Sequence, residues 1–139
     1  HNYLKNDKLT FVAANVVEYT YEQQDAIIIS DVLHYLQPDE QETVIQRCIS
    51  NIAENGIIIL RDGDADKAER HKGTELTEFF SIKAFGFNKS SGKPLSFMSG
   101  TRIREIAAKY GASVEQIDNT RYTSNIIFVL RKKAVPAYA

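Results

Sequence analysis

Polar side chains that could bind a ligand or move a proton stand where apolar runs of this chain end. They form three clusters: Asn15; Ser30, Asp31 and His34; and Arg61 with Asp62. For each residue alone, capping a turn between a strand and a helix is a sufficient role. Because open α/β sheets bind ligands just outside the carboxyl ends of their strands, the three clusters together indicate a site at that edge.

His34 is the candidate general base among these residues. An imidazole has an ordinary pKa of about 6.5 and therefore changes charge near neutral pH. A histidine that is hydrogen-bonded within its own turn is an equally good interpretation. A serine nucleophile is not indicated, because no Gly-x-Ser-x-Gly elbow surrounds Ser30.

Metal binding is not predicted. The three histidines show no His-x-x-x-His spacing, and the single cysteine, Cys48, cannot anchor a zinc site. We expect Cys48 to be a small core residue instead. The run Asp62–Asp66 resembles the first half of a calcium loop, but Lys67 stands where the turn glycine belongs.

The composition is typical of one globular domain. The chain has 139 residues, of which 43% are hydrophobic and 25% are charged, with a formal net charge of -1. This charge gives no electrostatic reason to expect nucleic-acid binding. No apolar run reaches the roughly 18 to 20 residues that span a bilayer, so we expect no direct membrane insertion. A single cysteine forms no internal disulfide, which suits a cytoplasmic protein.

The elements that must position the polar clusters begin with two expected strands. Leu9–Val12 is a plausible strand that leads to Asn15. Ala26–Ile29 is continuously apolar and rich in β-branched residues, which is typical of a strand buried on both faces of a parallel sheet.

A helix is predicted to start at Pro38, because proline favours a first helical position and acidic residues follow it. Apolar residues recur at helical spacing as far as Ile52, and Asn55-Gly56 is expected to form a left-handed C-cap. Ile57–Leu60 then reads as a second apolar strand. Strand, helix and strand make a βαβ unit, in which the two strands are parallel.

The rest of the chain is expected to add two helices and two strands. Thr74–Phe85 has a helical pattern, and Ser99 is a candidate N-cap for a helix through Tyr110 that Gly111 closes. Residues 113–118 and 124–131 read as an antiparallel strand pair. Five of the seven phenylalanines lie on either side of the loop 88–94 in the sequence: Phe79, Phe80, Phe85, Phe87 and Phe97. They are expected either to fill a core or to form a lid over an apolar substrate.

These residues resemble a known family. The run Asp25–Leu36, the helix after it, and the run Asn55–Asp62 are similar to the motifs around the fourth and fifth strands of class I S-adenosylmethionine-dependent methyltransferases. The closing helix and the terminal strand pair resemble the rest of that fold. The resemblance implies an α/β fold with an incomplete Rossmann-like methyltransferase sheet, in which parallel strands are followed by an antiparallel carboxyl-terminal pair.

The resemblance also implies roles for the polar clusters. Asn15 and Val16 would lie beside the adenine of S-adenosylmethionine, where the family usually has an acidic residue in place of Asn15. Ser30 and Asp31 would lie along the methionine part of the cofactor. His34, Arg61 and Asp62 would face the methyl acceptor.

The glycine-rich first loop of the family has no counterpart, since the seven glycines form no Gly-x-Gly. We therefore expect residues 1–139 to be a single, truncated methyltransferase domain from the third strand onward, inactive alone. Without the strands that the family places beside it, Ala26–Ile29 would present an unpaired apolar edge, and a homodimer through that edge is predicted.

The function implied for the complete protein is methyl transfer from S-adenosylmethionine to a small or apolar acceptor by in-line displacement. Two alternatives stay open. A nicotinamide-dependent Rossmann oxidoreductase would show the same alternation of strands and helices. A non-catalytic α/β dimerisation module would need no cofactor at all.

Overall fold

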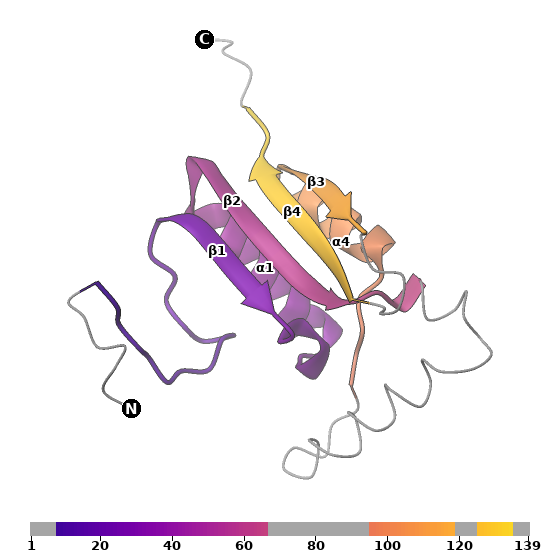
Figure 1. Cartoon of the computed structure of the whole chain (residues 1–139), viewed down its shortest axis with the longest axis horizontal. Coiled ribbons are helices and arrows are strands. Elements are labelled where there is room, and N and C mark those ends of the chain that lie inside the picture. The colour runs from indigo at the N-terminus through magenta and orange to yellow at the C-terminus, as the bar shows by residue number, and fades with distance from the viewer. Residues whose placement is uncertain (1–7, 67–94, 119–124, 135–139) are drawn as a thin grey trace.

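The computed structural model describes residues 8–66, 95–118 and 125–134 (Figure 1). In chain order the elements are β1 (Gln24–Ser30), the short 3-10 helix η1 (Leu33–Tyr35), α1 (Pro38–Asn51), β2 (Ile52–Gly63), α4 (Gly100–Lys109), β3 (Ala112–Ile117) and β4 (Asn125–Lys132). No helix in these described ranges is long and apolar enough to cross a membrane.

The strands form one mixed sheet in the order β1-β2-β4-β3. β1 and β2 are parallel, whereas β4 lies antiparallel to both β2 and β3. The predicted βαβ unit and the predicted antiparallel terminal pair are therefore confirmed. In the parallel pair Ser30 lies opposite Arg61, which brings the carboxyl ends of β1 and β2 together.

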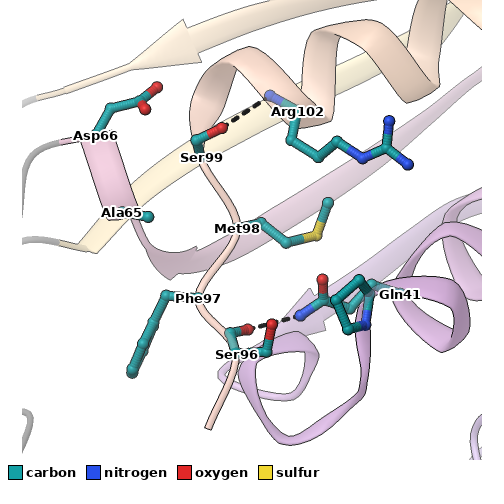
Figure 2. Close-up of a pocket in the computed structure, with 9 residues that line it drawn as sticks. Gln41, Ala65, Asp66, Ser96, Phe97, Met98, Ser99 and Arg102 are labelled. Atoms are coloured by element: carbon teal, nitrogen blue, oxygen red, sulfur yellow. Dashed lines mark hydrogen bonds between the residues drawn. The ribbon is translucent and has the colours of Figure 1, made fainter.

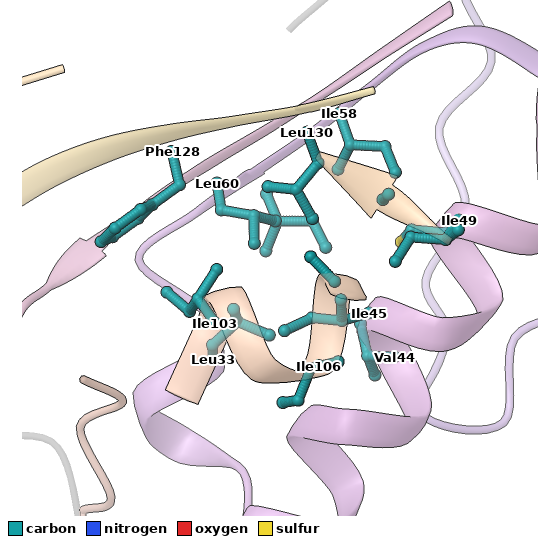
Figure 3. Packing of buried hydrophobic residues seen from close by; sticks show 14 of the residues in the cluster. Leu33, Val44, Ile45, Ile49, Ile58, Leu60, Ile103, Ile106, Phe128 and Leu130 are labelled. Carbon is teal, nitrogen blue, oxygen red and sulfur yellow. The ribbon is translucent and has the colours of Figure 1, made fainter. Parts of the chain in front are cut away.

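The core lies between the sheet and the helices α1 and α4, which pack on the same side of it (Figure 1). Its largest fully buried side chains come from the strands, from η1 and from the two helices; ten of the cluster are labelled in Figure 3. Cys48 belongs to this core with 0% exposure, as predicted, and burial raises the pKa of its thiol to about 12.

The prediction that Ala26–Ile29 is buried on both faces is wrong. Ile29 is 7% exposed, but its neighbour Ile28 is 69% exposed. Successive strand residues point to opposite faces of the sheet. Ile29 belongs to the core cluster, which lies on the face that the described helices cover. Within the described part of the chain, β1 is thus an edge strand with one covered face and one open face.

The predicted strand Leu9–Val12 is also wrong, because these residues form no strand. A strand needs a neighbour to satisfy its backbone groups, and β1 pairs only with β2 in the described part of the chain. Leu9, Phe11 and Val12 are consequently 48%, 74% and 61% exposed.

Helix α1 begins at Pro38, as predicted. Its N-cap is Gln37, whose backbone N–H donates to the Glu40 carboxylate at 2.8 Å in a capping box. The expected C-cap at Gly56 is wrong, since α1 ends at Asn51 and β2 follows directly. Gly56 instead lies in an irregularity of the β1–β2 ladder, where a Cβ atom would come within 2.7 Å of the Asp25 carbonyl oxygen.

Helix α4 and the hairpin after it match their predicted positions. The Ser99 hydroxyl accepts a hydrogen bond from the Arg102 backbone N–H at 3.0 Å, and Gly111 adopts a φ of +78° after the helix. The predicted helix Thr74–Phe85, the loop 88–94 and all the clustered phenylalanines except Phe97 lie outside the described residues.

Candidate functional site

His34 and Asp62 form a buried pair at the carboxyl ends of the two parallel strands. Their side chains are 9% and 7% exposed, and His34 Nδ1 lies 2.7 Å from Asp62 Oδ1. The other carboxylate oxygen accepts the His34 backbone N–H at 3.2 Å, and the Gly63 N–H donates to Oδ1 at 2.8 Å. In the tautomer that carries its proton on Nδ1, His34 donates this hydrogen bond to Asp62, and Nε2 is then the ring nitrogen able to accept a proton.

Aromatic rings and one backbone bond complete the surroundings of His34. The Phe97 ring stacks on the imidazole at a centroid distance of 5.1 Å and an interplanar angle of 17°. The centroid of the Tyr35 ring lies 4.2 Å from that of the imidazole. The Ser96 N–H donates to the His34 carbonyl at 2.9 Å. The sequence analysis assigned Phe97 only to a core or a lid. No sequence pattern predicted its contact with His34.

Ser30, Asp31 and Arg61 form a second, more exposed group. The Arg61 guanidinium is paired with the Asp31 carboxylate and donates to Ser30 Oγ at 3.3 Å. Ser30 Oγ also donates to Asp31 at 3.2 Å, and the Asp31 backbone N–H donates to the Arg61 carbonyl at 2.9 Å. Asp31 has a φ of +56°, a left-handed conformation that aspartate tolerates better than most residues.

Arg61 and Asp62 are adjacent in sequence but belong to different groups of this site. Arg61 and Asp62 follow one another on β2, so their side chains point to opposite faces of the sheet. Arg61 joins Asp31 on one face, whereas Asp62 joins His34 next to the core. The predicted pair Arg61-Asp62 is thus not a unit, although each member lies beside another predicted site residue.

Asn15 and Val16 lie in a separate turn. The Asn15 side chain accepts the Val17 N–H at 3.0 Å, and the Val16 carbonyl accepts the Tyr21 hydroxyl at 3.1 Å. Arg47 of α1 holds this turn by donating to the Val17 carbonyl. Within the described ranges, the hydrogen bonds of Asn15 and Val16 stay inside residues 15–21 and do not reach the strand ends.

Asp64 and Asp66, from the run that resembles half a calcium loop, cap helix α4. Asp64 is 3% exposed and accepts the Gly100 N–H at 3.1 Å, while Asp66 accepts the Thr101 N–H at 3.3 Å. Carboxylates at a helix N-terminus are stabilised by its partial positive charge. Among the residues with described positions, no group of three or more histidine, cysteine or acidic side chains could hold a metal ion.

A pocket of about 420 Å³ lies between the amino ends of α1 and α4 (Figure 2). It is lined by Pro38, Gln41, Ala65, Asp66, Ser96, Phe97, Met98, Ser99 and Arg102. Phe97 belongs both to this pocket and to the surroundings of His34. The Arg102 guanidinium forms salt bridges with Glu42 at 2.6 Å and with Glu105 at 3.3 Å. These two carboxylates compensate the positive charge that Arg102 brings to the pocket.

No protein-family model matches the chain. A curated relative, the carboxy-S-adenosyl-L-methionine synthase of Desulfotalea psychrophila, is 22% identical over 80 residues, which are 58% of this chain and 31% of that protein. The chain therefore spans about a third of the length of this relative.

Solved structures resemble the chain over most of its length. An O-methyltransferase family protein from Burkholderia thailandensis has a TM-score of 0.67 at 15% identity, covering 90% of this chain and 36% of that one. Magnesium protoporphyrin IX methyltransferase from Synechocystis PCC 6803, with bound SAH, has a TM-score of 0.61 at 20% identity, covering 89% and 51%. The chain has a methyltransferase-type fold. The resemblance to class I methyltransferases seen in the sequence is confirmed at the level of the fold.

Proposed function

We propose that this chain is part of an enzyme that transfers a methyl group from S-adenosylmethionine to a small or apolar acceptor. The observation that carries the proposal is the buried His34–Asp62 pair, which lies at the carboxyl ends of two parallel strands in a methyltransferase-type fold. The methyltransferase from Synechocystis is named for a small-molecule acceptor and holds SAH, which supports this choice of cofactor and substrate class.

The residues at the end of β1 suit a cationic cofactor. Ser30 and Asp31 present a hydroxyl and a carboxylate that are not buried, and such groups attract an ammonium group. Arg61 now compensates Asp31, so a bound ammonium would share or replace that partner. Asn15 and Val16 are proposed to lie beside the adenine. When bound, S-adenosylmethionine supplies a methyl group activated by a sulfonium.

His34 is the proposed base. Bound S-adenosylmethionine would supply the methyl group for displacement by an acceptor oxygen, nitrogen or carbon, and SAH would be the leaving group. Where the acceptor must lose a proton, Nε2 of His34 takes it, and Asp62 stabilises the resulting imidazolium through Nδ1. Most of the rate enhancement is expected to come from positioning of the two reactants.

Two further proposals concern the chain by itself. We expect the 139-residue chain to bind the cofactor weakly and to be inactive, because it contains no glycine-rich loop to approach the methionine part. We also propose that two copies associate through the open edge of β1, where Ile28 is 69% exposed. A cytoplasmic location stays our expectation.

One comparison favours a second function. The curated relative is named as a synthase of carboxy-S-adenosyl-L-methionine rather than as a methyltransferase. The same fold could therefore serve a reaction that alters the cofactor itself. That candidate shares the proposed cofactor site but needs no separate methyl acceptor.

Titration calorimetry tests the cofactor. SAH, S-adenosylmethionine and NAD⁺ are titrated into this chain and into a polypeptide extended at its amino end. The extended protein should bind SAH and not NAD⁺, and Asp31→Asn should weaken SAH binding. Asp25→Asn, an exposed site at the opposite end of β1, is the matched control and should bind normally. Heat with NAD⁺ but none with SAH would sink the proposal.

Transfer of a radiolabelled methyl group separates the two candidate reactions. With the extended polypeptide and a panel of small phenols and aromatic acids, labelled product is expected for a methyltransferase, and His34→Asn in that polypeptide should lower kcat by about 100-fold or more. Label that stays only in a modified cofactor would favour the synthase-like reaction.

A further inference from the structure

Gln41 is the polar exception on the inner face of α1. The other buried residues of this helix are Val44, Ile45, Cys48 and Ile49, and Gln41 is only 3% exposed among them. Burial of a primary amide is unfavourable unless its donors find partners. The contacts of Gln41 therefore need an explanation beyond the fold of the helix.

The Gln41 amide nitrogen bridges two segments that are far apart in sequence. Nε2 donates to the Leu33 carbonyl at 2.9 Å and to the Ser96 carbonyl at 2.6 Å; Figure 2 shows the second bond. Both hydrogens of the amide are used in this way. One side chain thus joins η1 to the segment that leads into α4.

The two bridged segments are also those that surround His34. Leu33 directly precedes His34 in η1, and Ser96 donates its N–H to the His34 carbonyl at 2.9 Å. The next residue, Phe97, stacks on the His34 ring. The imidazole is consequently bounded by Asp62 at Nδ1 and by Phe97 on one ring face.

We propose that Gln41 is a positioning residue, which holds η1 against residues 96–97 and thereby keeps the His34 ring in place between Asp62 and Phe97. The proposal rests on the proposed function only in treating His34 as the base. The bridge itself is a property of this chain and is measurable without any cofactor or acceptor.

Solution NMR of the 139-residue chain tests the bridge. Gln41→Met keeps the length of the side chain and removes both donors. The expected result is an amide exchange rate of Ser96 that rises about tenfold or more, together with changed His34 ring proton shifts, while core methyl signals stay dispersed. Gln46→Met is the matched control: Gln46 lies on the same helix, and in the described part of the chain its amide donates to the Ser50 hydroxyl at 3.3 Å. Its Ser96 and His34 signals should match the wild type.

A second variant separates the bridge from the aromatic stack. Phe97→Leu removes the stacked ring and leaves Gln41 intact, so the His34 ring shifts should change while Ser96 stays protected from exchange. Loss of Ser96 protection in Phe97→Leu would overturn the proposal, because the stack would then hold the segment. Unchanged Ser96 exchange in Gln41→Met, or loss of the dispersed core signals in that variant, would also overturn it.

Discussion

Asp62 contacts His34 through both of its carboxylate oxygens. Oδ1 lies 2.7 Å from the ring Nδ1, and Oδ2 accepts the backbone N–H at 3.2 Å. One buried carboxylate therefore sets both the position of the turn and the orientation of the imidazole.

Asp62→Asn should weaken the pair without emptying its space. An amide can accept at only one atom, so either the ring or a backbone N–H loses its acceptor. We expect the free energy of unfolding in urea to fall by about 1–3 kcal/mol, and the ¹⁵N signals of His34 to show loss of the Nδ1–H tautomer. Asp25→Asn, on the exposed amino end of β1, is the control. Equal stability of the two variants would contradict the pairing.

Glu42→Gln should remove a pH-dependent contribution to stability. Hydrogen bonds from Lys109 and Tyr110 lower the pKa of Glu42 below its ordinary value of 4.5. A carboxyl whose pKa is lowered by folding stabilises the protein above its unfolded-state pKa, and this contribution disappears as the pH falls through the folded-state pKa. Urea unfolding from pH 7 to pH 3 should show the variant weaker at pH 7 and equal to the wild type at the acid end. Glu105→Gln, which removes an exposed contact with Arg102, should have the smaller effect at pH 7.

Gly56→Ala should be more destabilising than Gly111→Ala. A Cβ atom at Gly56 would meet the Asp25 carbonyl oxygen and Ile52 Cγ1, both at 2.7 Å, so β1 and β2 would have to move apart. We expect a loss of about 1–3 kcal/mol from such overpacking. A Cβ atom at Gly111 would have no atom of the described residues within 4 Å, its chain neighbours aside. Only the φ of +78° opposes a side chain there, at about 1 kcal/mol. Urea unfolding that ranks the two variants in the opposite order would show that the strands tolerate the methyl group.

Ile28→Lys should abolish the proposed self-association. A lysine on the open face of an edge strand is a common natural protection against pairing between sheets. Size-exclusion chromatography with light scattering should give the mass of a dimer for the wild type and of a monomer for the variant. Ser113→Lys, at an exposed position of the opposite edge strand β3, should leave the mass unchanged. A monomeric wild type at micromolar concentration would refute the dimer.

Local signals in the sequence were sufficient for much of the fold. Pro38 followed by acidic residues located the start of α1, and Ser99 and Gly111 bounded α4, because caps depend on contacts within a few residues. Gly56 shows where this reasoning fails. Its role comes from the close approach of Asp25 on the neighbouring strand, which no local pattern encodes.

The sequence by itself determined the order of β1, α1, β2, α4, β3 and β4, the resemblance to class I methyltransferases, and most of the polar residues at the strand ends. Only the tertiary structure decided how those residues combine. Alternation along β2 separates Arg61 from Asp62, and the parallel register of β1 and β2 brings each to a partner that follows β1 in the chain. The contribution of Gln41 was likewise invisible in the sequence, because its two partners are backbone carbonyls that only the packed fold brings together.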